Sequence, residues 1–358
     1  MKKLLFAAHS LGLGGIETAL ITLLEELVKK EYEITLVLEK KEGIFLDTLN
    51  PKIKVIEYSP SNNKIVPIRK FINLFKQLKF KIQYKNKFDF AASYATYSLS
   101  NGFVARTASK NSALWVHLDY LMQNNNDQEK AKAYYKELKS EEFKHIIFVS
   151  KESRNNFIKL FPNCSEKAIY CNNLIDGEKI LEKSQEKLID NKENVVTFLN
   201  VGRHDERQKR LSRLIEAAEM LKNEGLKFKI LFVGDGQDNS LYKKMVEDKK
   251  LEDVITFLGQ KKNPYPYYKV SDCVVLTSDY EGYPVVFIES MILNKPIITT
   301  KVSDYEQIEG KYGIVTEKNV DDIYSAMKDF INKGFEIKEK FDYKKYNAEI
   351  LQSLEKIF

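Results

Sequence analysis

The second half of the chain alternates short apolar runs with amphipathic stretches, and this alternation constrains the fold more than any other feature. Stretches with helical spacing of apolar residues cover 210–223 and 239–250. Strands that alternate with helices form a parallel sheet wound by βα units. The sequence therefore predicts an α/β domain with a doubly wound, Rossmann-like sheet, whose strands are 195–201, 228–233, 254–259, 273–277 and 296–300.

The first half repeats this pattern less regularly, with helical stretches at 16–30 and 129–139 between apolar runs. We predict strands at 2–9, 33–40, 89–95, 112–118 and 145–150. Ligands of such sheets bind at the carboxyl ends of the strands, so two such domains are expected to face each other across a cleft. The predicted organisation is an N-terminal domain over 1–176, a polar linker over 177–194, a C-terminal domain over 195–340, and a helix over 341–358 that packs back on the N-terminal domain.

Composition excludes several classes of protein. The net charge of +6 is mild, and without a basic tail or an RNP-like motif we expect no nucleic-acid partner. The chain has no run of eighteen apolar residues, so we expect no transmembrane helix. Cys164, Cys171 and Cys273 show no metal-ligand spacing. We therefore expect a cytoplasmic protein with reduced thiols.

A glycine-rich turn follows the first predicted strand and opens a helix. Its glycines are Gly12, Gly14 and Gly15, and glycine lets a backbone approach an anion at a helix N-terminus. A dinucleotide fingerprint would need glycine where the chain has Glu17, so a dehydrogenase is disfavoured. We predict an anion-binding turn, with a purely structural tight turn as the alternative.

A second turn, after strand 195–201, is basic. Gly202 and Arg203 end the strand and Lys209 precedes the next helix, so guanidinium and ammonium groups lie where a diphosphate could bind. The alternative is a solvated basic face. The following turn, 233–237, contains Gly234 and is expected to line the same edge of the sheet.

Two glutamates, Glu281 and Glu289, follow strand 273–277. Gly282 breaks the chain between them, and Pro284 is suited to a first helical turn. Glu289 lies in an apolar helix, where a carboxylate needs partners. We predict that it accepts hydrogen bonds from a diol such as a ribose, with a buried salt bridge as the alternative. The backbone N–H groups predicted to face an anion are those of Tyr283, Val285 and Val286.

At these residues the chain resembles the retaining glycosyltransferases of family 4, which have the GT-B fold. The resemblance rests on "EGYPVVFIE", the E-x7-E element, with "VGRHDERQK", "VGDGQ", "NKPII", "NLID" and "GLGGIE". It spans nearly the whole chain and is strongest over 195–315. It implies transfer of a sugar from a nucleotide-sugar donor, bound by the C-terminal domain, to an acceptor bound by the N-terminal domain.

The resemblance also implies roles for single residues. Arg203 and Lys209 would stabilise the diphosphate leaving group, Glu289 would hold the ribose, and Glu281 would contact the sugar hydroxyls. Gly14 and Gly15 would line the donor phosphate or the acceptor. His117 matches the family's histidine near the reacting centre, although a lone histidine is more often structural.

The chain departs from the family pattern around the basic turn. Arg203 and Lys209 are one residue further apart than in many relatives, Arg210 replaces the usual glycine, and Gln237 stands where proline is common. These differences affect the expected geometry of the diphosphate site more than the assignment to this class of glycosyltransferases.

The expected chemistry needs no metal or cofactor. The chain has no D-x-D motif, and fixed cations can stabilise the departing diphosphate. The family's front-face mechanism, in which the leaving phosphate helps to deprotonate the acceptor, is expected over a covalent route through Glu281.

A basic segment lies in the first half. From Tyr58 to Phe88 there is no acidic residue, and apolar residues recur there at helical spacing. Such a helix is typical of membrane-surface binding, which would imply a lipid-linked acceptor and a peripheral location at the inner face of the cell membrane. Alternatively its apolar stripe packs on the sheet. The basic residues are Lys64, Arg69, Lys70, Lys76, Lys79, Lys81, Lys85 and Lys87.

The leading hypothesis is a retaining, metal-independent glycosyltransferase of cell-surface polysaccharide or glycolipid synthesis. By the family resemblance, uridine diphosphate is the expected nucleotide, with guanosine diphosphate as the alternative. A sugar-nucleotide epimerase is disfavoured by the E-x7-E element. A non-catalytic GT-B protein that binds glycans or a partner transferase is the alternative from another class.

Overall fold

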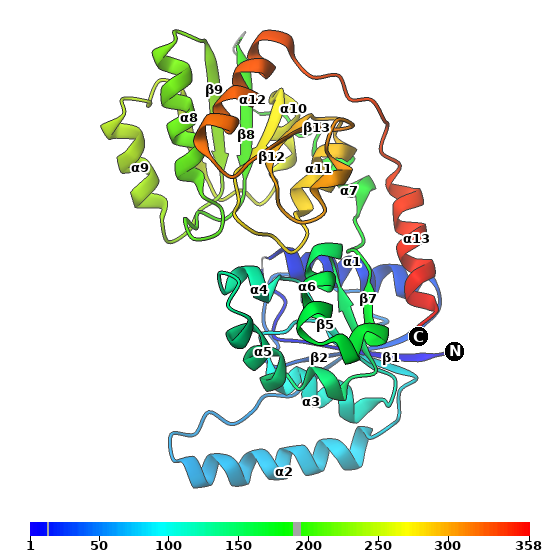
Figure 1. Ribbon diagram of the computed structural model, residues 1–358. Helices are drawn as coiled ribbons and strands as arrows, with labels where there is room; N and C mark the ends of the chain where they lie inside the picture. The colour runs from blue at the N-terminus through cyan, green and yellow to red at the C-terminus, as the bar shows by residue number, and fades with distance from the viewer. Residues whose placement is uncertain (13, 189–194) are drawn as a thin grey trace. The chain divides into compact units, whose positions relative to one another are not determined.

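The computed structural model describes residues 1–12, 14–188 and 195–358, which form two compact units. The N-terminal unit comprises Met1–Ile175 with Lys345–Phe358, and the C-terminal unit comprises Asp176–Lys344. Each unit is a parallel sheet with its own helices, coloured along the chain in Figure 1. The predicted α/β class is therefore confirmed.

The N-terminal unit has a seven-stranded sheet in the order β3-β2-β1-β4-β5-β6-β7. All its pairs are parallel, and five of the six residues of β1 are buried. Its strands are β1 (Lys3–Ala8), β2 (Glu33–Leu38), β3 (Lys54–Glu57), β4 (Phe90–Ser93), β5 (Ser112–Val116), β6 (His145–Phe148) and β7 (Ala168–Tyr170). Its helices are α1 (Gly15–Lys29), α2 (Val66–Tyr84), α3 (Leu99–Ala108), α4 (Tyr120–Gln123), α5 (Gln128–Glu137) and α6 (Lys151–Leu160), with 3-10 turns at Ser140–Glu142 and Pro162–Lys167.

The C-terminal unit has a six-stranded parallel sheet in the order β10-β9-β8-β11-β12-β13. Its strands are β8 (Val196–Val201), β9 (Phe228–Val233), β10 (Ile255–Gly259), β11 (Cys273–Leu276), β12 (Ile297–Thr300) and β13 (Gly313–Thr316). Its helices are α7 (Gly177–Lys183), α8 (Leu211–Asn223), α9 (Asn239–Asp248), α10 (Tyr265–Val270), α11 (Val285–Ile292) and α12 (Val320–Lys333), with a 3-10 turn at Tyr305–Gln307.

The strand order reverses direction once in each sheet. In the N-terminal unit the reversal lies between β1 and β4, and in the C-terminal unit between β8 and β11. Connections leave such a point toward opposite sides, so the loops after the two strands part and leave room for a ligand at the carboxyl edge. The loops after these four strands are therefore where each unit is expected to bind its substrate.

The boundary between the units differs from the prediction in one respect. The expected linker 177–194 begins with helix α7, which belongs to the C-terminal unit and packs against α10 and α11. Its polar composition concealed a short amphipathic helix that buries Ile180. The part of the predicted linker at 189–194 lies outside the described residues. Helix α13 (Tyr343–Glu355) begins at the end of the C-terminal unit, and Lys345–Phe358 belong to the N-terminal unit.

Helix α2 is attached to its unit by one face only. It lies beside α3 at the periphery of the N-terminal unit in Figure 1, and Phe80 is its one buried residue. The apolar stripe expected to pack on the sheet comprises Ile68, Phe71, Ile72, Phe75 and Leu78. That expectation is wrong for four of the five, because Ile68 (44%), Phe71 (72%), Phe75 (66%) and Leu78 (54%) are exposed, as is Ile82 (78%) one turn further on. Among the described residues, no helix combines the length and hydropathy that a membrane span requires.

The pairing of β12 with β13 requires a residue without a side chain. A Cβ on Gly313 would overlap the backbone carbonyl of Ile297 in the neighbouring strand. We expect Gly313→Ala to destabilise the C-terminal unit by about 3 kcal/mol, since backbone cannot move aside as a side chain can. Hydrogen exchange of β12 and β13 measures this loss.

Gly310→Ala is the matched control for this substitution. Gly310 has a φ of +67°, but a Cβ there would meet no atom within 4 Å. Alanine at this position then costs about 1 kcal/mol, because a residue with a Cβ disfavours a positive φ. An equal or larger effect of Gly310→Ala would contradict the proposed overlap.

Candidate functional site

The reversal point of the C-terminal sheet brings two loops together. The loop after β8 carries Arg203 and Lys209, and the loop after β11 carries Glu281. Because β8 and β11 are neighbours in the sheet, both loops leave the same edge. Three residues predicted from the sequence, Arg203, Lys209 and Glu281, therefore lie on loops at this edge.

A buried ion pair joins the two loops. The ammonium nitrogen of Lys209 lies 2.6 Å from a carboxylate oxygen of Glu281, and the Ser278 hydroxyl donates to the same oxygen at 2.7 Å. The Gln208 amide donates to the other oxygen at 3.2 Å. Glu281 is only 7% exposed. It therefore lies inside the loops with three donors, rather than outside as an unpaired acid.

Gln208 and Arg203 extend this cluster toward solvent. The Gln208 amide oxygen accepts from the Arg203 guanidinium at 3.1 Å while its nitrogen holds Glu281. The Arg203 side chain is 66% exposed, and its nearest acid, Asp205, is 3.7 Å away. Arg203 therefore presents positive charge that the protein neutralises only weakly. Gln208 was not among the residues predicted from the sequence, because nothing local distinguishes a bridging glutamine from a surface one.

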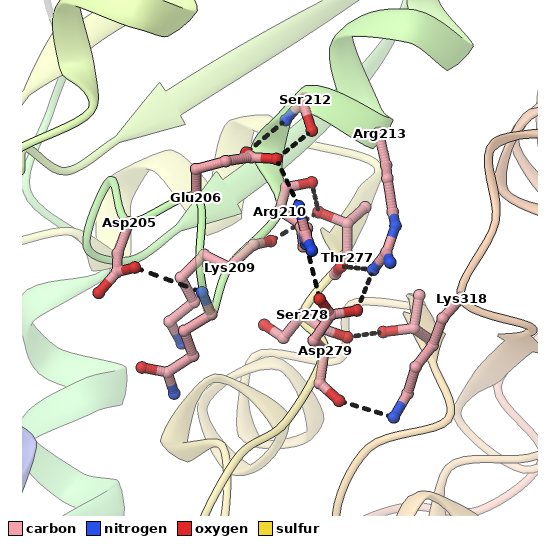
Figure 2. A network of polar contacts seen from close by, with 12 residues as sticks. Asp205, Glu206, Lys209, Arg210, Ser212, Arg213, Thr277, Ser278, Asp279 and Lys318 are labelled. Carbon is pink, nitrogen blue, oxygen red and sulfur yellow. Dashed lines mark hydrogen bonds and ion pairs between the residues drawn. The ribbon is translucent and has the colours of Figure 1, made fainter. Parts of the chain in front are cut away.

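A polar network beside the ion pair fixes the two loops to each other (Figure 2). Arg210 donates to Asp279 at 2.6 Å, and Arg213 lies 2.6 Å from the other oxygen of that carboxylate. Lys318 donates to the Asp279 carbonyl at 2.6 Å, and Glu206 accepts from Arg210 at 3.2 Å. These contacts hold the backbone from which Lys209 reaches Glu281.

Arg210 adopts a left-handed conformation, with φ of 50°. Glycine enters this region without steric cost, which accounts for the glycine usual at this place in the family that the sequence resembles. Here an arginine adopts it because Asp279 and Glu206 hold its guanidinium. The departure from the family pattern is therefore compensated by two ion pairs.

A glycine of the neighbouring turn allows close backbone packing. A Cβ on Gly234, whose φ is +153°, would overlap the carbonyl of Gly202. The Gly202 amide in turn donates to the Val233 carbonyl at 3.0 Å. Gly234 thus has a structural reason that the sequence alone did not reveal, whereas a Cβ on Gly202 would only touch the Lys209 side chain, at 3.7 Å.

Helix α11 begins beside the ion pair. Pro284 is its N-cap, so the helix starts one residue later than the first-turn proline predicted from the sequence. Val285 and Val286 form the first turn, where N–H groups have no carbonyl one turn earlier to accept them. Gly282 is buried, and its carbonyl accepts from the Ser303 hydroxyl. The Tyr283 hydroxyl donates to Gln307 at 2.9 Å.

Glu289 lies one turn further along α11 and is partly buried. Tyr268 donates to one of its carboxylate oxygens at 2.6 Å and Tyr265 to the other at 3.3 Å. Burial raises its pKa, while these hydrogen bonds act in the opposite direction. Among the described residues, no lysine or arginine pairs with it. The alternative of a buried salt bridge is therefore wrong, and two phenols are the partners instead.

The N-terminal unit contains the other predicted residues. The Glu17 carboxylate lies where a Cβ on Gly14 would be, so an anion approaching Gly14 meets a negative charge, and Gly15 opens α1. The ring nitrogen Nε2 of His117 lies 2.8 Å from the Tyr94 carbonyl. A carbonyl only accepts, so Nε2 carries the proton and Nδ1 is an acceptor. Burial lowers the pKa of His117 to about 4, which keeps the ring neutral at pH 7.

The ion pair is expected to stabilise the loops of the C-terminal unit. Lys209→Met leaves the buried Glu281 carboxylate without its counterion, which costs about 3–5 kcal/mol. Faster hydrogen exchange of β8 and β11 should report this loss. In Lys209→Met/Glu281→Gln most of the protection should return, because the uncompensated charge is gone. Arg203→Met, at an exposed cation, is the control and should leave exchange unchanged; equal exchange in all variants would contradict the coupling.

The sequence is similar to known proteins over part or nearly all of its length. Residues 179–348 match the family model described as glycosyl transferases group 1. The chain is 26% identical over 357 residues to N-acetylgalactosamine-N,N'-diacetylbacillosaminyl-diphospho-undecaprenol 4-alpha-N-acetylgalactosaminyltransferase of Campylobacter jejuni, with 95% of this chain and 94% of the relative aligned. It is 27% identical over 192 residues to an uncharacterised glycosyltransferase of Methanocaldococcus jannaschii, with 48% of this chain and 47% of the relative aligned.

Solved structures share the fold. Anabaena HepE, in complex with UDP and glucose, superposes with a TM-score of 0.76 at 18% identity, covering 99% of this chain and all of that one. A mutant of Staphylococcus aureus TarM, in complex with Fondaparinux, alpha-GlcNAc-glycerol and UDP, gives a TM-score of 0.77 at 14% identity, covering 100% of this chain and 99% of that one. Two parallel doubly wound sheets, the family match over the C-terminal unit and the similarity to transferases make this chain a glycosyltransferase of the GT-B fold.

Proposed function

We propose that the protein is a retaining glycosyltransferase of family 4 that transfers a sugar from a UDP-sugar to a saccharide on a lipid carrier. The observation that carries this proposal is the ion pair of Lys209 with Glu281, bridged through Gln208 to the exposed Arg203, at the reversal point of the C-terminal sheet. The E-x7-E spacing of Glu281 and Glu289 supports the family assignment. Structural neighbours that bind UDP support the choice of nucleotide.

The charges of this site suit a diphosphate that leaves with negative charge. Arg203 offers planar donors for a phosphate, and the Lys209 ammonium has two N–H donors beyond the one that faces Glu281. Val285 and Val286 add backbone N–H groups at the helix start. Donors held in place before the reaction stabilise developing charge without reorganisation. This is how the site would lower the barrier to bond cleavage.

Each unit, taken by itself, has further candidate contacts for a substrate. Glu289 would hold the ribose hydroxyls, and Tyr265 and Tyr268 already orient its carboxylate. Glu281 would contact the sugar while Lys209 and Gln208 hold it. In the N-terminal unit, the unprotonated Nδ1 of His117 can accept a hydrogen bond from a sugar hydroxyl. Gly14 and Gly15 remain proposed contacts, although Glu17 disfavours an anion at Gly14.

Retention of anomeric configuration is proposed to occur without a covalent intermediate. Three donors from Lys209, Ser278 and Gln208 occupy the Glu281 carboxylate, and a carboxylate so stabilised is a weak nucleophile. The leaving phosphate would then accept the acceptor's proton on the same face. The names of relatives from Campylobacter jejuni and Staphylococcus aureus specify alpha-glycosyl transfer, as expected for retention from an alpha-linked donor.

Transfer is further proposed to need no metal ion or cofactor. Arg203 and Lys209 would supply the positive charge that a divalent cation supplies in other transferases. A non-catalytic role is less well supported, because relatives from Campylobacter jejuni and Staphylococcus aureus are named as transferases and because the cations and both glutamates of the site are present.

A lipid-linked acceptor is proposed from helix α2. Five apolar side chains along one stripe of this helix are exposed, and no acidic residue occurs from Tyr58 to Phe88. Apolar insertion combined with lysines suits the headgroup region of an anionic bilayer. The Campylobacter jejuni relative is named for a diphospho-undecaprenol-linked saccharide, and an Acholeplasma laidlawii relative for a diacylglycerol product. We therefore propose peripheral attachment at the inner face of the cell membrane.

The donor can be identified by thermal shift with UDP, GDP and a panel of UDP-sugars. UDP and one UDP-sugar should raise the melting temperature, since a ligand that binds the folded state stabilises it. Arg203→Ala should weaken UDP binding about tenfold by removing a charge-assisted contact, and a chelator should leave binding and transfer unchanged. Arg207→Ala, another exposed cation of the same loop, is the matched control. Loss of sugar transfer in the presence of the chelator, or an unchanged melting temperature with every nucleotide, would contradict the proposal.

Membrane binding by α2 is testable by sedimentation with liposomes of phosphatidylglycerol. Phe71→Ser/Phe75→Ser should abolish binding, because both rings are exposed on the stripe. Lys79→Glu/Lys85→Glu should reduce binding to anionic vesicles. Lys76 is left unchanged because its ammonium donates to the Ser59 carbonyl at 2.8 Å.

Lys243→Glu/Lys244→Glu, on α9 of the C-terminal unit, makes the same change of charge away from α2. It should bind vesicles as the parent chain does. Equal loss in this control, or full binding by the Phe71/Phe75 variant, would refute the role of α2.

A further inference from the structure

A histidine–carboxylate pair lies at the reversal point of the N-terminal sheet, outside the residues discussed above. His9 directly follows β1 and Glu39 directly follows β2. The Nδ1 atom of His9 lies 2.5 Å from a carboxylate oxygen of Glu39. β1 is also the strand at which the sheet order reverses, so the pair lies at the edge where a doubly wound sheet binds its ligand.

Glu39 is held in place from its other side. The hydroxyls of Ser98 and Ser100, at the start of α3, both donate to its second oxygen. Ser98 is also the N-cap of α3 and accepts from the Asn101 amide at 3.1 Å. Three adjacent strands, β2, β1 and β4, thus contribute to one hydrogen-bonded chain that ends at the imidazole.

The donor-to-acceptor direction of these hydrogen bonds determines which imidazole nitrogen of His9 can accept a further hydrogen bond. An ionised carboxylate only accepts, so Nδ1 of a neutral His9 carries the proton and donates it to Glu39. Nε2 is then the unprotonated nitrogen and can accept a hydrogen bond. Among the described residues, nothing donates to Nε2.

The exposed fractions of the side chains show which end of this series of hydrogen bonds faces solvent. The Glu39 side chain is 13% exposed, whereas that of His9 is 38% exposed. The ring of Tyr97 lies edge-on to the imidazole with centroids 6.2 Å apart, and its hydroxyl donates to Glu17 at 3.1 Å. Tyr97 is itself half exposed. An oriented acceptor nitrogen therefore lies beside an accessible aromatic ring.

We propose that Nε2 of His9 accepts a hydrogen bond from a hydroxyl of the sugar acceptor. Glu39 is a positioning residue that holds the imidazole in the accepting tautomer, and the Tyr97 ring packs against the apolar face of the same sugar. This inference rests on the proposed function, since a saccharide acceptor is the hydroxyl-bearing substrate of that reaction. A pair that only joined β1 to β2 would need neither the exposed nitrogen nor two serines behind the carboxylate.

The test compares transfer and hydrolysis by the full chain. The probes are the UDP-sugar found by thermal shift and the octyl glycosides of glucose, galactose, N-acetylglucosamine and N-acetylgalactosamine. His9→Ala should raise the KM for the accepted glycoside about tenfold, as for one lost hydrogen bond, and leave the KM for the UDP-sugar and its hydrolysis unchanged. With the parent chain, one monodeoxy form of that glycoside should have a KM raised by a similar factor. His9→Ala should raise the KM for this monodeoxy form no further.

His145→Ala is the matched control. His145 begins β6, at the opposite edge of the same sheet, and its Nε2 is bonded to Asn111 at 3.0 Å. It should leave both KM values unchanged. Nitrogen NMR of the parent chain should show an unprotonated Nε2 on His9, and Glu39→Gln should shift the ring toward a mixture of tautomers with an intermediate KM for the glycoside.

The outcomes separate two failures. If no UDP-sugar binds, the proposed function fails and this inference falls with it. If donor binding and hydrolysis are normal but His9→Ala uses the glycoside as the parent does, or no glycoside is bound, the inference alone is overturned. A doubly protonated His9 at neutral pH, or an equal effect of His145→Ala, also overturns it.

Discussion

The buried contact between Lys209 and Glu281 is the interaction on which the rest of the C-terminal unit's site depends. It joins the loops after β8 and β11, where the sheet order reverses. A charge pair that is nearly removed from water must be well satisfied, and Ser278 and Gln208 supply the remaining hydrogen bonds. The same arrangement leaves Arg203 exposed at the edge of the cluster. Structural cohesion and the capacity to bind an anion therefore come from one set of contacts.

The surroundings of this pair show how strain and charge are balanced. Arg210 occupies a left-handed conformation, and the Asp279 and Glu206 carboxylates hold it there. Gly234 allows its turn to touch the backbone of Gly202 in the neighbouring turn. These features keep the loop rigid, and rigidity is what lets fixed donors act on a developing charge.

The N-terminal unit contributes features of another kind. Helix α2 exposes its apolar stripe, and His9 exposes the free nitrogen of an imidazole oriented by Glu39. Both would serve the acceptor in the proposed reaction, one through its lipid and the other through its sugar. His117, whose pKa burial lowers to about 4, provides a neutral ring at the same edge of the sheet.

From the sequence alone we could predict the α/β class, most strands, and the loops that carry Arg203, Lys209, Glu281 and Glu289, because hydrophobic period and loop position are local properties. Short strands such as β3, β7 and β13 and helix α7 escaped it, since few residues carry their signal. The pairing of side chains became known from the folded chain: Glu281 pairs with Lys209, Glu289 with two tyrosines and His9 with Glu39. The exposure of the α2 stripe likewise follows from the fold. Such contacts join residues far apart in the chain, and sheet order, which spacing does not encode, brings them together.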